Sequence, residues 1–135
     1  MRYTQNMKVY ITAKFGTGNK EEIDNMCALV QKSGFEDFCF VRDVDEKFQD
    51  AHELMQRAKE EIATCDVLLI QYDGPSHGRI VELGIAYALD KMIILITKEG
   101  TFIKETILGV TDAVIEYNQL EDIVTPLAQL YSDWT

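Results

Sequence analysis

Short apolar runs alternate with amphipathic segments along most of this chain. The runs at 7–15, 38–41, 66–72, 91–97 and 113–117 are rich in β-branched and aromatic residues and predict five strands. Two of them, "DVLLIQY" and "KMIILIT", are almost continuously apolar. Strands covered on both faces are expected to have this composition.

The segments between these runs carry the helical period of apolar residues. From Asn19, apolar side chains recur at the i, i+3, i+4, i+7 spacing until Ser33-Gly34, which supplies a stop signal. The same period predicts helices over 51–62, 78–89, 102–108 and 120–131. Pro126 is expected to start a new turn of the last helix or to kink it.

Strands that alternate with helices at this spacing predict an α/β fold. We expect one domain, residues 1–135, built as a three-layer, doubly wound, flavodoxin-like or Rossmann-like fold on a five-stranded parallel sheet. Ligands of such folds bind at the carboxyl ends of the strands near the switch point. The candidate loops are therefore 13–19, 42–47, 72–79 and 97–101.

Charge narrows the range of partners. The formal net charge is −10 and the 13 Lys and Arg residues are scattered, so nucleic acid is not an expected partner. A small anion remains compatible, because one Arg and several backbone N–H groups can make a pocket locally positive.

The cysteines and the hydropathy of the chain suggest a cytoplasmic protein. Cys27, Cys39 and Cys65 lack metal-ligand spacing and sit among apolar neighbours, so we expect buried free thiols. No apolar run approaches the roughly 18 residues that span a bilayer, so no membrane partner is expected. Neither a metal nor another cofactor is predicted.

The segment "YDGPSHGRIVELG" (72–84) joins a turn to a helix that carries a carboxylate. Its "DGPS" stretch is turn-forming, and Ser76 or its neighbour can cap the helix. Glu82 follows between Val81 and Leu83 on a helix that reads as apolar on most sides and hence as buried. A solvent-facing glutamate is the simpler alternative, but a buried one that points into a cleft can act as a nucleophile or stabilise an oxocarbenium-like centre.

Three stretches carry a resemblance to a known family. They are "VYITAKF" (9–15), "CDVLLIQYDGPSHGRIVELGIAYALDKMIILI" (65–96) and "ILGVTDAVIEY" (107–117). Together they resemble the nucleoside 2-deoxyribosyltransferase family, which includes the 2′-deoxynucleoside 5′-monophosphate N-glycosidases. The most specific part combines Asp66, the "DGPS" turn, and the Gly-x-x-x-Glu-Leu-Gly motif with a small-residue helix that ends in Lys91.

The resemblance implies roles for individual residues. Glu82 matches the catalytic glutamate that attacks C1′ of the sugar, and Tyr10 matches a tyrosine close to that glutamate. Ser76 stands where members acting on free nucleosides commonly carry Asp, whereas the monophosphate hydrolases have Ser. The resemblance therefore favours hydrolysis of a nucleoside monophosphate over base exchange between nucleosides.

The same comparison suggests phosphate-binding residues and a homodimer or higher homo-oligomer. Gly78 and Arg79 at the helix start suit an anion. Lys14 can reach the phosphate or stay solvated, and His77 can contact the ligand or lie exposed. Lys104 aligns near a segment that reaches the neighbouring subunit's site in the family.

Two departures from the family pattern bear on activity. The loop "AKFGTGNK" (13–20) has glycines but no Arg, and Ala58 stands where the family often has an acidic residue that assists the sugar or the leaving base. Asp50, Glu53 and Asp73 are the candidate substitutes, and Asp73 is kept in the predicted catalytic set with Glu82 and Tyr10. The alternative is an altered or absent activity.

Other functions receive less support. A non-catalytic nucleotide-binding module is the main alternative to an enzyme, and a TIR-like domain that cleaves NAD is a more distant one. Ser76 and His77 are adjacent, so they do not form the geometry of a serine hydrolase. No Walker A or strict G-x-G-x-x-G sequence is present.

Overall fold

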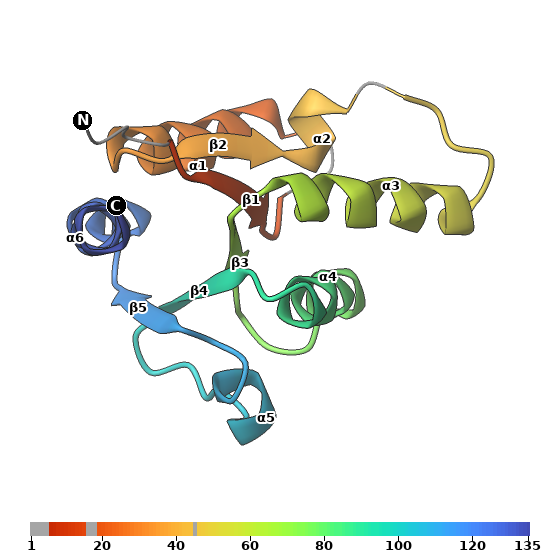
Figure 1. The fold of residues 1–135 in the computed structure, drawn as a ribbon. Coiled ribbons are helices and arrows are strands. Elements are labelled where there is room, and N and C mark those ends of the chain that lie inside the picture. The colour runs from red at the N-terminus through yellow and green to blue at the C-terminus, as the bar shows by residue number, and fades with distance from the viewer. Residues whose placement is uncertain (1–5, 16–18, 45) are drawn as a thin grey trace.

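The computed structural model describes residues 6–15, 19–44 and 46–135. Five strands form one parallel sheet in the order β2-β1-β3-β4-β5 (Figure 1). Their bounds are β1 Lys8–Thr12, β2 Glu36–Cys39, β3 Val67–Gln71, β4 Met92–Lys98 and β5 Ala113–Tyr117. The predicted five-stranded, doubly wound α/β fold is confirmed.

Helices cover both faces of this sheet. They are α1 Lys20–Lys32, α2 Phe40–Asp43, α3 Ala51–Thr64, α4 His77–Ala88, α5 Glu105–Leu108, the 3-10 helix η1 Leu120–Ile123 and α6 Val124–Trp134. In Figure 1, α1 and α6 lie on one side of the sheet, and α3 and α4 lie together on the other. Pro126 lies in the first turn of α6, where its missing N–H costs no helical hydrogen bond.

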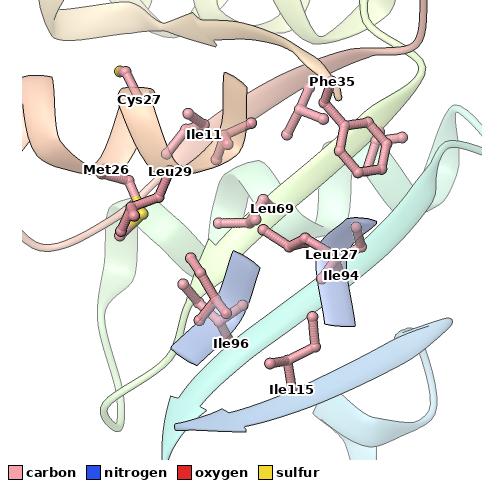
Figure 2. Close-up of a cluster of buried hydrophobic side chains, with 14 of the residues drawn as sticks. Ile11, Met26, Cys27, Leu29, Phe35, Leu69, Ile94, Ile96, Ile115 and Leu127 are labelled. Carbon is pink, nitrogen blue, oxygen red and sulfur yellow. The ribbon is translucent and has the colours of Figure 1, made fainter. Parts of the chain in front are cut away.

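The alternation of side chains along β1 divides the core into two clusters. Val9 and Ile11 join the cluster beneath α1 and α6, which Figure 2 shows. Tyr10 points to the opposite face and packs in the cluster beneath α3 and α4 with Leu68. Each fully buried Leu or Ile contributes about 1.5–3 kcal/mol, so both clusters fix the sheet between its helices.

The second strand lies two residues earlier in the chain than the sequence pattern indicates. The run at 38–41 predicts a strand through Val41, but β2 ends at Cys39 and Phe40 begins α2. The Asp43 carboxylate accepts a hydrogen bond from the Cys39 N–H at 2.9 Å, and the Val44 N–H closes the turn onto the Phe40 carbonyl at 3.0 Å. These local bonds compete with strand pairing, and they leave Val41 63% exposed.

Two helices at the C-terminal side also differ in extent. The segment predicted as a helix over 102–108 is helical only as α5, and Phe102 before it is 78% exposed. The segment predicted over 120–131 divides into η1 and α6, and the helix continues to Trp134.

Two residues of the motif that resembles the family, Asp66 and Lys91, form hydrogen bonds near the amino ends of the strands. Asp66 accepts a hydrogen bond from the Lys8 N–H at 2.9 Å, which ties the start of β1 to the start of β3. Lys91 donates to the Ala63 carbonyl at 3.0 Å near the end of α3. Both contacts are structural, and the first holds β1 in the register that positions Tyr10.

Candidate functional site

A cleft of about 670 Å³ opens beside the carboxyl ends of β1 and β2 and against the start of α4, the helix that follows β3. The chain reverses its winding direction between β1 and β3, which is where ligands of doubly wound sheets bind. The volume falls in the range of small-molecule sites. The cleft is lined by Tyr10, Ile11, Thr12, Ala13, Lys14, Phe15, Cys39, Phe40, Val41, Val44, Glu46, Phe48, Leu54, Met55, Ala58, Ser76, Gly78, Arg79 and Glu82.

Glu82 lies in the cleft with both carboxylate oxygens hydrogen-bonded. The Tyr10 hydroxyl donates to Oε2, and the Thr12 hydroxyl donates to Oε1 at 2.9 Å. Tyr10 and Thr12 are two residues apart on β1, so both side chains project from the same face of the sheet. The strand and α4 together fix the orientation of the carboxylate.

Burial and hydrogen bonding act on Glu82 in opposite directions. Burial raises the pKa of the Glu82 carboxyl, while the bonds from Tyr10 and Thr12 oppose that rise. The pKa of Tyr10 is also raised, first by burial and then by the neighbouring Glu82 carboxylate. Tyr10 therefore keeps its proton and remains a donor to Glu82.

The raised pKa of Glu82 predicts a pH-dependent cost in stability. A folded-state pKa above the unfolded value of about 4.3 means that stability falls as pH rises from that value through the folded pKa. Glu82→Gln removes this titration, so the variant is expected to gain a few degrees in Tm over the wild type at pH 7–8 and to lose that gain below about pH 4.

Thermal unfolding followed by circular dichroism across this pH range checks the prediction. Glu36→Gln is the matched control. Glu36 is exposed at the amino end of β2, away from the carboxyl ends where the cleft lies, and its replacement also removes one negative charge. A Tm difference for Glu82→Gln that stays the same at every pH would show that burial does not perturb this carboxyl.

The mouth of the cleft presents polar donors from the start of α4. Ser76 is the N-cap residue, but its side chain makes no capping hydrogen bond within the described part of the chain. Its hydroxyl and the N–H groups of the first helical turn, Gly78 included, are therefore available to a ligand. The positive end of a 12-residue helix favours an anion at this position.

Two cations flank this mouth and share one carboxylate. Arg79 donates to Asp73 Oδ1 at 2.8 Å and to the Gln71 carbonyl at 2.5 Å. The Lys14 ammonium lies 3.8 Å from Asp73 Oδ2. The Lys14 N–H also donates to the Gln71 side chain at 3.2 Å, so the loop after β1 is tied to the end of β3.

Another part of the cleft lining is apolar and aromatic. The rings of Phe40 and Phe48 stack with centroids 6.0 Å apart and an interplanar angle of 29°. Leu54, Met55 and Ala58 of α3 continue this wall. A flat heteroaromatic group can pack against such a surface.

The structure brings together six of the nine site residues predicted from the sequence. Five of them share the cleft with Glu82, namely Tyr10, Lys14, Ser76, Gly78 and Arg79. Among the described residues that line the cleft, Asp73, His77 and Lys104 are not found. His77 is exposed at the first position of α4, and Lys104 is exposed at the N-cap of α5, which Figure 1 shows apart from α3.

Sequence reasoning missed Thr12 and the aromatic wall. The alternation of β1 could have identified Thr12, since it follows Tyr10 by two positions. The apolar period of α3 contains Met55 and Ala58 but does not distinguish a cleft wall from core. No sequence signal places Phe40 beside Phe48, because that contact depends on the turn at α2.

The position of Ala58 in the wall bears on catalysis. Its methyl group lies where the resemblance implies an acidic side chain. Asp50 is engaged as the N-cap of α3, accepting from the Glu53 N–H at 2.9 Å, and Glu53 accepts from the Gln49 N–H at 3.3 Å. Neither lines the cleft in the described structure, so neither replaces the missing acid.

Helix α4 is less buried than its composition indicates. Val81 is 51% exposed and Tyr87 57% exposed, whereas Leu83 and Ala86 are buried. The prediction of a helix buried on most sides is therefore wrong. Glu82 is partly buried because it lies inside the cleft against Tyr10 and Thr12 of β1. The exposed apolar side chains lie elsewhere on the helix.

Within residues 6–15, 19–44 and 46–135, the cysteines and the metal-ligating residue types form no second site. All three cysteines are free and buried, as predicted. Burial raises the pKa of Cys65 to about 11, which makes that thiol unreactive near neutral pH. Among the residues described, no group of three or more His, Cys, Asp or Glu could hold a metal ion, and no helix has the length and apolarity to cross a membrane.

A family model matches most of the chain. The model described as nucleoside 2-deoxyribosyltransferase covers residues 9–122, which include β1, the cleft residues and α4. Comparison with curated proteins finds no match.

Solved structures match the fold over nearly the whole chain. The Clostridium botulinum CMP N-glycosidase BcmB is 23% identical with a TM-score of 0.69, covering 92% of this chain and 98% of that one. A 2-deoxyribosyltransferase from Bacillus psychrosaccharolyticus is 19% identical with a TM-score of 0.67, covering 89% and 95%. A conserved protein from Enterococcus faecalis is 13% identical with a TM-score of 0.76, covering 93% and 99%.

Proposed function

The chain belongs to the nucleoside 2-deoxyribosyltransferase family, an enzyme family, and from this premise we propose that it hydrolyses the N-glycosidic bond of nucleoside or deoxynucleoside 5′-monophosphates. The observation that carries the proposal is the Glu82 carboxylate, oriented by Tyr10 and Thr12 inside a cleft whose mouth offers anion-binding groups. The likeness to a CMP N-glycosidase supports the same reaction class.

The proposed reaction proceeds in two displacements at C1′ of the sugar. A Glu82 oxygen bonds to C1′ while the C1′–N bond breaks, and the base leaves with the bonding electrons and takes a proton from water. A second water then attacks C1′ while the bond between C1′ and the Glu82 oxygen breaks, and its proton passes to the hydroxide that the first water left. This step releases the sugar phosphate and restores the Glu82 carboxylate. The Tyr10 and Thr12 hydroxyls hold the carboxylate in the attacking orientation and oppose its protonation.

Two parts of the cleft lining suit the two ends of a nucleotide. At the mouth, the Ser76 hydroxyl, the N-terminus of α4, Arg79 and Lys14 can bind the 5′-phosphate. Elsewhere in the lining, the stacked rings of Phe40 and Phe48 can pack against the base. Glu82 lines the same cleft, so we place the sugar beside its carboxylate.

The proposal is tested by base release from a panel of substrates. Ribo- and deoxyribonucleoside monophosphates, together with the corresponding nucleosides, are incubated with the protein and the free base is quantified by chromatography. We expect release from a monophosphate with water alone as acceptor. Release that requires a second free base as acceptor would instead identify base exchange.

The pH dependence of the reaction is expected to follow Glu82. The nucleophile must be deprotonated, and its raised pKa places the acid limb of kcat/KM above the pH at which an exposed glutamate titrates, about 4.3. Tyr10→Phe removes a hydrogen bond that lowers this pKa, so the limb is expected to move to higher pH. Rate profiles from pH 4 to 9 check this shift.

The control for that profile is Tyr87→Phe. Tyr87 lies on the same helix as Glu82 but is 57% exposed, so its hydroxyl is not expected to affect the limb. An acid limb in Tyr10→Phe that coincides with the wild type, or lies at lower pH, contradicts the assignment of the limb to Glu82.

The methyl group of Ala58 favours one second candidate, a nucleotide-binding module without turnover. With no acidic side chain at that point of the cleft wall, the leaving base has no side-chain acid there to protonate it. Calorimetry with nucleoside monophosphates, run beside the base-release assay, separates the two candidates. Binding without base release supports the module.

We also propose that the protein is a homodimer in the cytoplasm. Lys104 lies outside the cleft of its own chain, in keeping with a role at a neighbouring subunit's site. The exposed Val81 and Tyr87 of α4 offer apolar surface for such a contact. Light scattering coupled to size-exclusion chromatography measures the mass, and a value near 15.4 kDa would contradict the dimer.

A further inference from the structure

An acidic side chain, Asp73, forms ion pairs with the two cations at the mouth of the cleft. Asp73 lies 2.8 Å from an Arg79 nitrogen through one oxygen and 3.8 Å from the Lys14 ammonium through the other. Lys14 and Arg79 line the cleft, whereas Asp73 does not. The carboxylate therefore holds the cations from outside the space that a ligand would fill.

We propose that Asp73 is an internal competitor for the anionic group of the substrate and limits how tightly the site holds a phosphate. This inference rests on the proposed function, which places a 5′-phosphate at this mouth. It gives Asp73 a role in specificity in place of the catalytic role predicted from the sequence.

The surroundings of Arg79 show that Asp73 is not needed to hold it in place. The other terminal nitrogen of Arg79 donates to the Gln71 carbonyl at 2.5 Å, at the end of β3. The Arg79 side chain is only 12% exposed, whereas that of Asp73 is 46% exposed. Arg79 is thus fixed by the sheet and by packing, and the carboxylate is the exchangeable partner.

The charges at the mouth make this competition effective. Lys14 and Arg79 supply two positive charges, and Asp73 neutralises one of them. A phosphate monoester carries about −1.5 to −2 at pH 7, so it both competes with Asp73 for the cations and is repelled by it. The Lys14–Asp73 pair is exposed and hence weak, and the Asp73 side chain itself is 46% exposed, so the substrate can displace Asp73 without a change in fold.

Asp73→Asn is therefore expected to strengthen phosphate binding. The variant keeps the size of the side chain and removes its charge. We expect the dissociation constant for inorganic phosphate and the KM for 2′-deoxycytidine 5′-monophosphate to fall about threefold to fivefold. The KM for 2′-deoxycytidine, which has no phosphate, is expected to stay the same.

Two further variants separate a local effect from a change in net charge. Asp73→Glu keeps the carboxylate, so it is not expected to show the gain in phosphate affinity that Asp73→Asn shows. Glu36→Gln makes the same change in net charge at the exposed amino end of β2, away from the cleft. It is expected to leave phosphate binding unchanged.

Calorimetric titration with inorganic phosphate tests the inference directly. Unchanged, weaker or undetectable phosphate binding in Asp73→Asn overturns it, and weaker binding would make Asp73 a positioning residue for Arg79. Stronger phosphate binding by Asp73→Asn, with no base release by any variant, would uphold the competitor role and reject the proposed hydrolysis. The two proposals therefore fail separately.

Discussion

Glu82→Gln is expected to reduce the rate of base release by about 10³-fold to 10⁶-fold, the range for loss of a nucleophile that acts within a hydrogen-bonded unit. The amide is nearly the same size, and its oxygen still accepts a hydrogen bond from one of the two hydroxyls that bind the carboxylate, while its NH2 group can only donate to the other. It does not form the ester with C1′. The measurement is chromatographic quantification of free base from a 2′-deoxynucleoside 5′-monophosphate.

The thermal stability of Glu82→Gln shows whether a loss of activity could come from unfolding of the variant. Glu82→Gln is expected to be at least as stable as the wild type at neutral pH, because it removes a buried carboxylate whose pKa is raised by burial. A folded variant that keeps the full rate of base release would rule out Glu82 as the nucleophile.

Ser76→Asp is expected to select against the phosphate. A carboxylate at the N-cap of α4 would face the dianionic group, so kcat/KM for a deoxynucleoside monophosphate should fall about 30-fold to 100-fold. The value for the matching deoxynucleoside should change by less than about threefold, since that substrate brings no charge to the mouth. Steady-state kinetics with both substrates measures the two ratios.

Ser76→Asn is the matched control for this change. Ser, Asp and Asn are all favourable N-cap residues, so neither variant is expected to weaken α4. Asn has nearly the shape of Asp but no charge, and it can still donate a hydrogen bond to an anion. Equal losses in the Asp and Asn variants would show that size, and not charge, governs the position.

The sequence predicts the sheet because its signals are local and repeated. The almost continuous apolar runs around Leu68 and Ile94 favour strands covered on both faces, and a doubly wound sheet places the ends of β1 and β3 side by side. The resemblance then identified Glu82, Tyr10 and Ser76, and the structure brings all three into one cleft.

The parts that the sequence does not predict depend on contacts between distant elements. The stacking of Phe40 on Phe48 follows from a turn that Asp43 closes, and the pattern of the 38–41 run indicates only a strand. The pairing of Asp73 with Arg79 and Lys14 depends on the path of two loops from different strands. For the same reason, composition alone overstated the burial of α4.

The central claim is a covalent bond between Glu82 and C1′ of the sugar, and mass spectrometry tests it most directly. The protein is incubated with a 2′-fluoro-2′-deoxynucleoside 5′-monophosphate, whose fluorine slows both displacements, then quenched in acid and digested with trypsin. We predict one added fluorodeoxyribosyl phosphate on the 80–91 peptide, located at Glu82 by fragmentation and absent from Glu82→Gln. An adduct on another residue, formed while base is released, would contradict the assignment of Glu82 as the nucleophile. An adduct that persists in Glu82→Gln would contradict it as well.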